Sequence, residues 1–114
     1  MNERTIAGPM ELRHGRWQDV LADVPACDLL LCDPPYSART HEGRRHGKAA
    51  LDSDGIDYGM LDLSDDVARL VAWATERVRE FVVIFGDHET VRWWRSDFEC
   101  AGWYVFPPSI WHKT

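Results

Sequence analysis

The sequence lacks a long hydrophobic run and a hydrophobic leader. Its longest uninterrupted apolar stretch, residues 81–85, is far shorter than the roughly 20 residues that a membrane-spanning helix requires. The residues that follow Met1 are polar and contain no apolar core of a signal peptide. From these absences we expect a cytoplasmic protein that has no membrane partner.

Cysteine is also scarce. Cys27, Cys32 and Cys100 form an odd set with no C-x-x-C pair, which excludes a disulfide framework and a four-thiolate zinc site. His41 and His46 could in principle join Cys32 at a zinc ion, but structural zinc takes four well-placed ligands and the spacing supplies no fourth. We therefore expect no metal.

Basic residues are few overall but are concentrated in one segment. The chain has 114 residues, a formal net charge of −6 and 45% apolar residues, which is typical of one small domain with its own core. An acidic balance argues against a nucleic-acid partner, because phosphates must be met by Lys and Arg. Residues 37–48 nevertheless hold four basic side chains and a single acidic one. This segment either contacts phosphates or is a solvated loop, and the pattern leaves both open.

The hydrophobic pattern predicts alternating strands and helices. Residues 28–32 and 81–85 are continuous apolar runs, typical of strands covered on both faces, whereas residues 37–61 show no period and form a long loop. We expect further strands at residues 10–13 and 103–106. Helical spacing marks three segments, one around Trp17, one from Ser64 to Val78, and one from Val91 to Ala101. This order predicts an α/β sandwich with a mainly parallel sheet.

In such sheets, ligands bind beyond the carboxyl ends of the strands. One of these ends carries Asp33-Pro34-Pro35-Tyr36 directly after the apolar run Leu29-Leu30-Leu31-Cys32. The prolines hold the backbone extended and offer carbonyl oxygens without competing N–H donors. Asp33 and the Pro34 carbonyl could accept the two hydrogens of an exocyclic amino group, and the Tyr36 ring could stack on the heterocycle. The nitrogen lone pair would then be available as a nucleophile.

These residues resemble the catalytic signature of the DNA amino-methyltransferases, in which an apolar strand precedes (Asp/Asn/Ser)-Pro-Pro-(Tyr/Phe/Trp). The segments around the motif, residues 14–21, 37–41, 81–88 and 102–106, look like phage-type or prophage-type members. The resemblance implies a partial Rossmann-like sandwich and a transfer of methyl from S-adenosylmethionine to a flipped adenine, with cytosine less favoured. It implies catalytic roles for Asp33, Pro34, Pro35 and Tyr36. It also makes DNA the partner, contacted by Ser37, Arg39, Arg44, Arg45 and Lys48.

The sequence departs from this family at the cofactor site. Relatives hold S-adenosylmethionine with a Phe-x-Gly-x-Gly turn, and none of the eight glycines here forms a Gly-x-Gly pair. Many relatives also carry an acidic residue where Arg16 follows Gly15, so no cofactor contact is assigned. We therefore expect residues 1–114 to be the amino-terminal catalytic portion of a truncated methyltransferase, inactive alone, with an exposed apolar surface where the carboxy-terminal half would pack.

Other interpretations stay open. Asp33 could simply cap a turn at the end of a strand, and Asp87 more readily caps the following helix than takes part in catalysis. A DNA-binding remnant or regulatory module without activity would use the basic segment alone. Related chemistry would methylate RNA or a protein amide, and a metal phosphoesterase would need more ligands than Asp33, Asp87 and His88.

Overall fold

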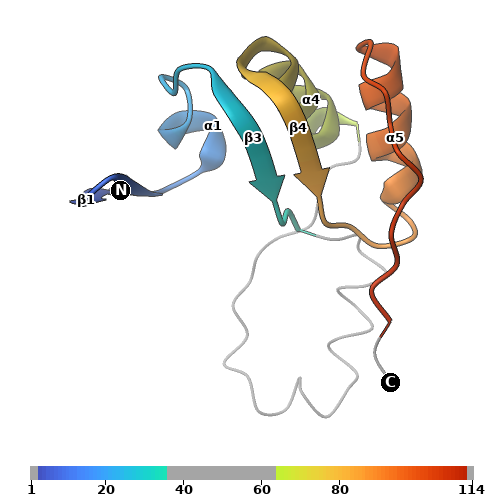
Figure 1. Ribbon diagram of the computed structural model, residues 1–114, viewed down its shortest axis with the longest axis horizontal. Coiled ribbons are helices and arrows are strands. Elements are labelled where there is room, and N and C mark those ends of the chain that lie inside the picture. Colours follow the sequence, from blue (N-terminus) through green and yellow to red (C-terminus); the bar gives the residue numbers. More distant parts are fainter. Residues whose placement is uncertain (1–2, 36–63, 113–114) are drawn as a thin grey trace.

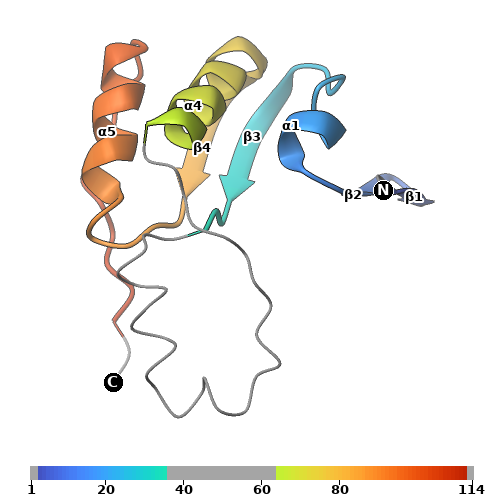
Figure 2. The same ribbon diagram turned by 180° about the vertical axis from the view of Figure 1, so that it is seen from behind.

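The computed structural model describes residues 3–35 and 64–112. At its centre β3 (Cys27–Cys32) and β4 (Val78–Ile84) pair in parallel, and α4 (Asp65–Arg77) and α5 (Val91–Cys100) lie on one face of the pair (Figures 1 and 2). An antiparallel hairpin, β1 (Glu3–Ala7) and β2 (Met10–His14), and the short helix α1 (Trp17–Val20) precede β3. The α/β class and the parallel pairing are confirmed. A Rossmann-like sandwich would need more parallel strands than the described residues contain.

Helix α4 forms because its apolar residues recur on one face. Val67, Leu70, Val71 and Ala74 follow the i, i+3, i+4, i+7 spacing, and all four are buried. Asp65 and Asp66 lie in the first turn, where the helix dipole favours negative charge. The predicted helix is confirmed, except that Val78 begins β4 instead of ending α4.

Helix α5 supplies the aromatic part of the same core. Trp94 and Phe98, one turn apart, are buried, and their ring centroids lie 6.4 Å apart. Trp93 is 38% exposed, which confirms that two adjacent tryptophans cannot share one helix face. The helix ends where Gly102 adopts a positive φ of 94°, a conformation that favours glycine.

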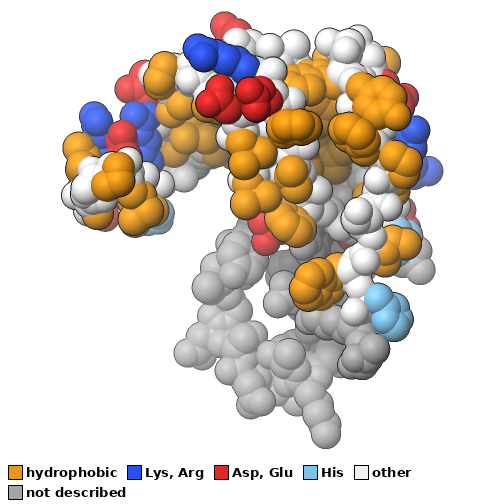
Figure 3. All heavy atoms as spheres, viewed as in Figure 1, with side chains coloured by type: hydrophobic (Ala, Val, Ile, Leu, Met, Phe, Trp, Pro, Cys, Tyr) orange, Lys and Arg blue, Asp and Glu red, His pale blue; other side chains and the backbone are white. Residues whose placement is uncertain are grey.

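The opposite face of the β3–β4 sheet is open. Leu30, Cys32, Val82 and Ile84 turn toward α4 and α5 and pack against the core. The alternate residues are exposed, so that hydrophobic side chains gather on the surface over these strands (Figure 3); they are Leu29, Leu31, Phe81, Val83 and Phe85. The expectation that both strands are covered on both faces is wrong for the described residues. An apolar run shows that the side chains of a strand are hydrophobic, but it does not show which elements pack against them.

The strand expected at residues 103–106 is also absent from the described part of the chain. Trp103 and Val105 pack against the core while Tyr104 and Phe106 are exposed, so the side chains alternate as they do in a strand. The segment makes no ladder, however, and is therefore not part of either sheet. The pattern predicted the alternation correctly and the pairing incorrectly.

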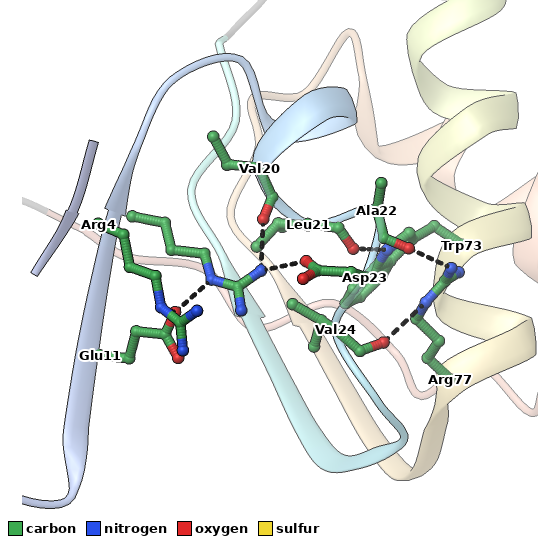
Figure 4. A network of polar contacts seen from close by, with 10 residues as sticks. Arg4, Glu11, Val20, Leu21, Ala22, Asp23, Val24, Trp73 and Arg77 are labelled. Carbon is green, nitrogen blue, oxygen red and sulfur yellow. Dashed lines mark hydrogen bonds and ion pairs between the residues drawn. The ribbon is translucent and has the colours of Figure 1, made fainter. Parts of the chain in front are cut away.

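Polar contacts attach the amino-terminal part of the chain to α4 (Figure 4). Arg13 on β2 donates to the Val20 carbonyl at 2.7 Å and to the Asp23 carboxylate at 2.5 Å. On α4, the Trp73 indole donates to the Leu21 carbonyl at 3.1 Å, and Arg77 donates to the carbonyls of residues 22 and 24, each at 3.2 Å. Strand β1, which the sequence pattern missed, reaches this network through the Arg4–Glu11 ion pair.

Candidate functional site

The candidate site lies at the carboxyl edge of the parallel pair. Cys32 is in register with Ile84, and the Phe85 N–H donates to the Cys32 carbonyl at 2.9 Å, one position beyond the end of β4. This bond extends the ladder to the point where both strands end. As a result, Asp33 and Gly86 leave the sheet from neighbouring positions, as expected for ligand-binding residues of a parallel sheet.

Asp33, Pro34 and Pro35 are placed at this edge as the sequence predicts. Asp33 is exposed, and the two prolines are half-buried. The carboxylate is therefore accessible to a ligand, while the rings behind it restrict the backbone. Tyr36, the fourth residue of the motif, lies outside the described residues, and so do Ser37, Arg39, His41, Arg44, Arg45, His46 and Lys48. Their roles stay predictions.

Cys32 lies directly before the motif and faces the core side of the sheet. Burial raises the pKa of the Cys32 thiol, and the negative charge of the adjacent Asp33 raises it further. Both effects favour the neutral thiol. Cys32 is thus a packing residue at this edge, and no disulfide forms among the three cysteines.

The turn between β4 and α5 is held by a reciprocal cap. The Thr90 N–H donates to the Asp87 Oδ1 at 2.9 Å, and the Asp87 N–H donates to the Thr90 Oγ1 at 3.2 Å. This is the arrangement of a capping box, in which two free backbone donors are satisfied by each other's side chains. The Asp87 side chain thus caps the turn that leads into α5, while the N-cap residue of the helix itself is Thr90, without a side-chain cap hydrogen bond.

Thr90 is a site residue that the sequence analysis missed. Thr90 is 1% exposed, and a Cβ added at Gly86 would lie 2.8 Å from its Oγ1. A larger residue at 86 would therefore displace either the cap or the strand end beside Asp33. The sequence offered only a weak signal, because Thr is common at helix N-caps and Thr90 directly precedes an apolar helical pattern.

The residues considered for a metal site do not form one in the described part of the chain. No three His, Cys, Asp or Glu side chains there are grouped as metal ligands. The Asp87 carboxylate is engaged by Thr90, and the exposed His88 places Nε2 at 3.1 Å from the Glu89 Oε1. Asp33, Asp87 and His88 thus share an edge of the sheet without forming a metal centre.

The predicted S-adenosylmethionine site stays a prediction, because no group in residues 3–35 and 64–112 identifies it. At the carboxyl edge, the space beside Gly86 is filled by the Thr90 hydroxyl. A shallow groove does occur between α4 and α5, but residues such as Ala72, Cys100 and Ala101 line it, at the opposite end of α5 from Asp87.

No family model, curated protein or solved structure matches this chain. Among the helices that the structure describes, none is both long and apolar enough to cross a membrane. The function is therefore inferred from the chemistry of the residues at the carboxyl edge of the sheet.

Proposed function

We propose that this chain provides the amino-group-binding corner of a DNA methyltransferase that acts on the exocyclic nitrogen of a flipped adenine, with cytosine less favoured. The observation that supports this function most directly is the position of Asp33. Its exposed carboxylate follows a parallel strand, and two half-buried prolines come next. This combination presents fixed acceptors to a ligand at the sheet edge.

The chemistry of the corner follows from its acceptors. The Asp33 carboxylate accepts one hydrogen of the amino group, and the Pro34 carbonyl accepts the other. Two acceptors in fixed positions draw the nitrogen lone pair out of conjugation with the ring, so that it becomes available to an electrophilic methyl group. Asp33 need not be a strong base, because the proton can leave after the methyl group has arrived.

A base inside a duplex cannot reach this corner. The proposed substrate is therefore a nucleotide flipped out of the stack, with its ring on Tyr36 and its pairing edge toward Asp33. In this proposal the basic segment contacts the phosphates of the DNA through Ser37, Arg39, Arg44, Arg45 and Lys48. These contacts rest on the sequence resemblance alone.

The methyl group would come from S-adenosylmethionine. Because the sequence has no Gly-x-Gly turn to hold this cofactor, the proposal assigns residues 3–35 and 64–112 only the binding and orientation of the amino group. We accordingly expect that titrating the 114-residue chain with S-adenosylmethionine releases no heat. Tight binding would show that the chain holds the cofactor in a way that this proposal does not include.

The proposed amino-group site is tested by measuring whether the protein binds a base with an exocyclic amino group more tightly than a base without one. Single-stranded oligonucleotides of deoxyadenosine are compared with matched oligonucleotides of purine deoxyriboside, which lacks that group. Hydrogen bonds to a charged acceptor contribute about 1.5–3 kcal/mol, so we expect roughly tenfold or greater preference for adenine. Asp33→Ala should abolish the preference, while Asp33→Asn, which keeps one acceptor oxygen, should retain part of it. Equal binding of both oligonucleotides by the unmodified protein would contradict the proposal.

A second candidate is a DNA-binding module without catalytic function. The absence of a Gly-x-Gly turn from the sequence favours it. Such a module would bind both oligonucleotides equally, its affinity would fall steeply with salt, and Asp33→Ala would leave binding unchanged. Replacing Arg44 and Arg45 with Ala should flatten the salt dependence under either function, so the Asp33 variants are what separate the two.

A further inference from the structure

Phe85 is an exposed aromatic residue one position beyond the end of β4. Its side chain is 49% exposed, and its N–H donates to the Cys32 carbonyl at 2.9 Å. Because Cys32 is in register with Ile84, this bond places Phe85 opposite Asp33 on the neighbouring strand. The next residue after Asp33 is Pro34, which has no N–H to continue the ladder. Phe85 and Asp33 are therefore the last neighbours of the parallel pair.

The Phe85 and Asp33 side chains leave the sheet on the same face. Successive side chains of a strand alternate between the two faces. Ile84 and Cys32 pack against the core, whereas Phe85 and Asp33, which follow them, are exposed. The residue before a proline favours an extended conformation, so the alternation continues through Asp33. Since neighbouring strands are about 4.8 Å apart, the aromatic ring is adjacent to the carboxylate.

Phe85 is the part of the open apolar face that borders the candidate site. Hydrophobic side chains gather over β3 and β4 (Figure 3), and Phe85 is the one at the carboxyl end of this group. Phe81 is a second exposed aromatic residue of the same strand and face, but it is in register with Leu29. Four residues of extended chain, roughly 13 Å, separate the two rings along the strand. A base bound at Asp33 is thus within reach of Phe85 and out of reach of Phe81.

From this arrangement we propose that Phe85 is a substrate-binding residue, whose ring packs against the heterocycle that Asp33 holds by its amino group. This role rests on the proposed function, because it takes a nucleobase as the ligand of Asp33. The two side chains act differently. The carboxylate distinguishes bases that carry an amino group, whereas an aromatic ring packs against the π-system of any base. Phe85 therefore contributes to the affinity for bases in general, and Asp33 to the choice among them.

The probes are oligonucleotides in which one central residue varies within an otherwise abasic strand, so that the sugar–phosphate backbone is the same in all of them. The central residue carries adenine, purine or no base. Phe85→Ala should weaken binding of the adenine and purine probes by the same factor, roughly tenfold, and should leave binding of the abasic probe unchanged. The preference for adenine over purine should persist in this variant. Fluorescence anisotropy of labelled probes gives each Kd.

Phe81→Ala is the matched control, because it removes a ring of similar exposure from the same strand and face. It should leave binding of all three probes nearly unchanged. Phe85→Leu keeps an apolar side chain without the aromatic ring and should also weaken the two base-bearing probes equally, which provides the comparison if Phe85→Ala does not fold. Circular dichroism checks that each variant is folded.

Three results would overturn the role of Phe85: no loss of binding in either Phe85 variant, an equal loss for the abasic probe, or an equal loss in Phe81→Ala. Failure of the proposed function gives a different result. In that case the unmodified protein binds the adenine and purine probes equally, while the contact of Phe85 with the base is still measured by the difference between base-bearing and abasic probes.

Discussion

The two faces of the β3–β4 sheet differ in burial although their composition is alike. Leu30 and Val82 pack against α4 and α5, while their chain neighbours Leu31 and Val83 are 64% and 43% exposed. Hydrophobic side chains line both faces, yet only one has helices against it. An apolar strand sequence thus indicates where a strand forms, whereas the burial of that strand depends on which other elements lie beside it.

The largest difference between the faces should appear when aromatic side chains are truncated. Phe98 is 6% exposed and Phe81 is 57% exposed. Phe98→Ala should cost about 3–5 kcal/mol of unfolding free energy, because it removes a buried ring and leaves a cavity. Phe81→Ala should cost less than about 1 kcal/mol. Urea unfolding followed by circular dichroism measures both. Equal losses would show that the open face is covered in solution.

A smaller but closely matched difference is expected within β3. Leu30→Ser places a hydroxyl against the core and should destabilise the protein by about 2–4 kcal/mol, since it combines lost apolar burial with a polar group that lacks a partner. Leu31→Ser should change stability by no more than about 0.5 kcal/mol and should reduce self-association. The midpoint of urea unfolding and light scattering at high concentration provide the two measurements. A destabilising Leu31→Ser would contradict the assignment of the open face.

Local pattern was sufficient to predict most elements of the fold. Helical spacing placed α4 and α5, and the apolar runs placed β3 and β4, because each depends on side chains within one segment. Burial of the second sheet face and pairing of residues 103–106 depend on contacts between distant segments, which the pattern does not specify. Strand β1 was missed because its polar residues outnumber its apolar ones, and its pairing with β2 follows from a turn at Gly8 with φ of 60°.

The same distinction between local pattern and contacts across a turn applies to the residues of the candidate site. The Asp33-Pro34-Pro35 corner was predicted correctly at the carboxyl end of a strand, because a motif that follows an apolar run has its position fixed by that strand. Thr90 was missed because its importance comes from its position beside Gly86 across the β4–α5 turn. The basic residues between 37 and 48 lie outside the described residues, so the predicted DNA contacts are untested.

The β1–β2 hairpin is held by charged side chains, whereas the β3–β4 sheet is lined by apolar ones. Lowering the pH should therefore destabilise the hairpin before it destabilises the sheet. Arg13 holds the pKa of Glu11 and of Asp23 below their ordinary values, mainly through side-chain hydrogen bonds. A lowered carboxyl pKa stabilises the folded state above the unfolded-state pKa, and this stability is lost as the pH falls below about 4. The protection factors of amides in β1 and β2, which correct for the intrinsic pH dependence of exchange, should therefore fall on acidification before those in β3 and β4 do.

Asp23→Asn is the matched variant for the hairpin. It keeps an acceptor for Arg13 and removes one of the two titrating groups, so the loss of protection with falling pH should become weaker while protection at neutral pH changes little. Amide exchange followed residue by residue between pH 7 and pH 3 measures both effects. Simultaneous loss of protection in the hairpin and in β3 would show that the Arg13 contacts do not hold the hairpin separately from the sheet.

The smallest expected effect is on the alkylation rate of Cys32, which packs on the covered face of the sheet and directly precedes Asp33 of the candidate site. This thiol is half-buried, and its pKa is raised first by burial and then by the charge of Asp33. Cys100 is exposed, so iodoacetamide should alkylate it faster than Cys32 at pH 8. Asp33→Asn removes the second cause only, and the Cys32 rate should rise by a small factor while the Cys100 rate stays constant. Mass spectrometry of the alkylated peptides gives both rates, with Cys27 as an internal reference on the same strand. If Asp33→Asn accelerates all three cysteines equally, the variant has loosened the fold, and the carboxylate has no specific electrostatic effect at the edge of β3.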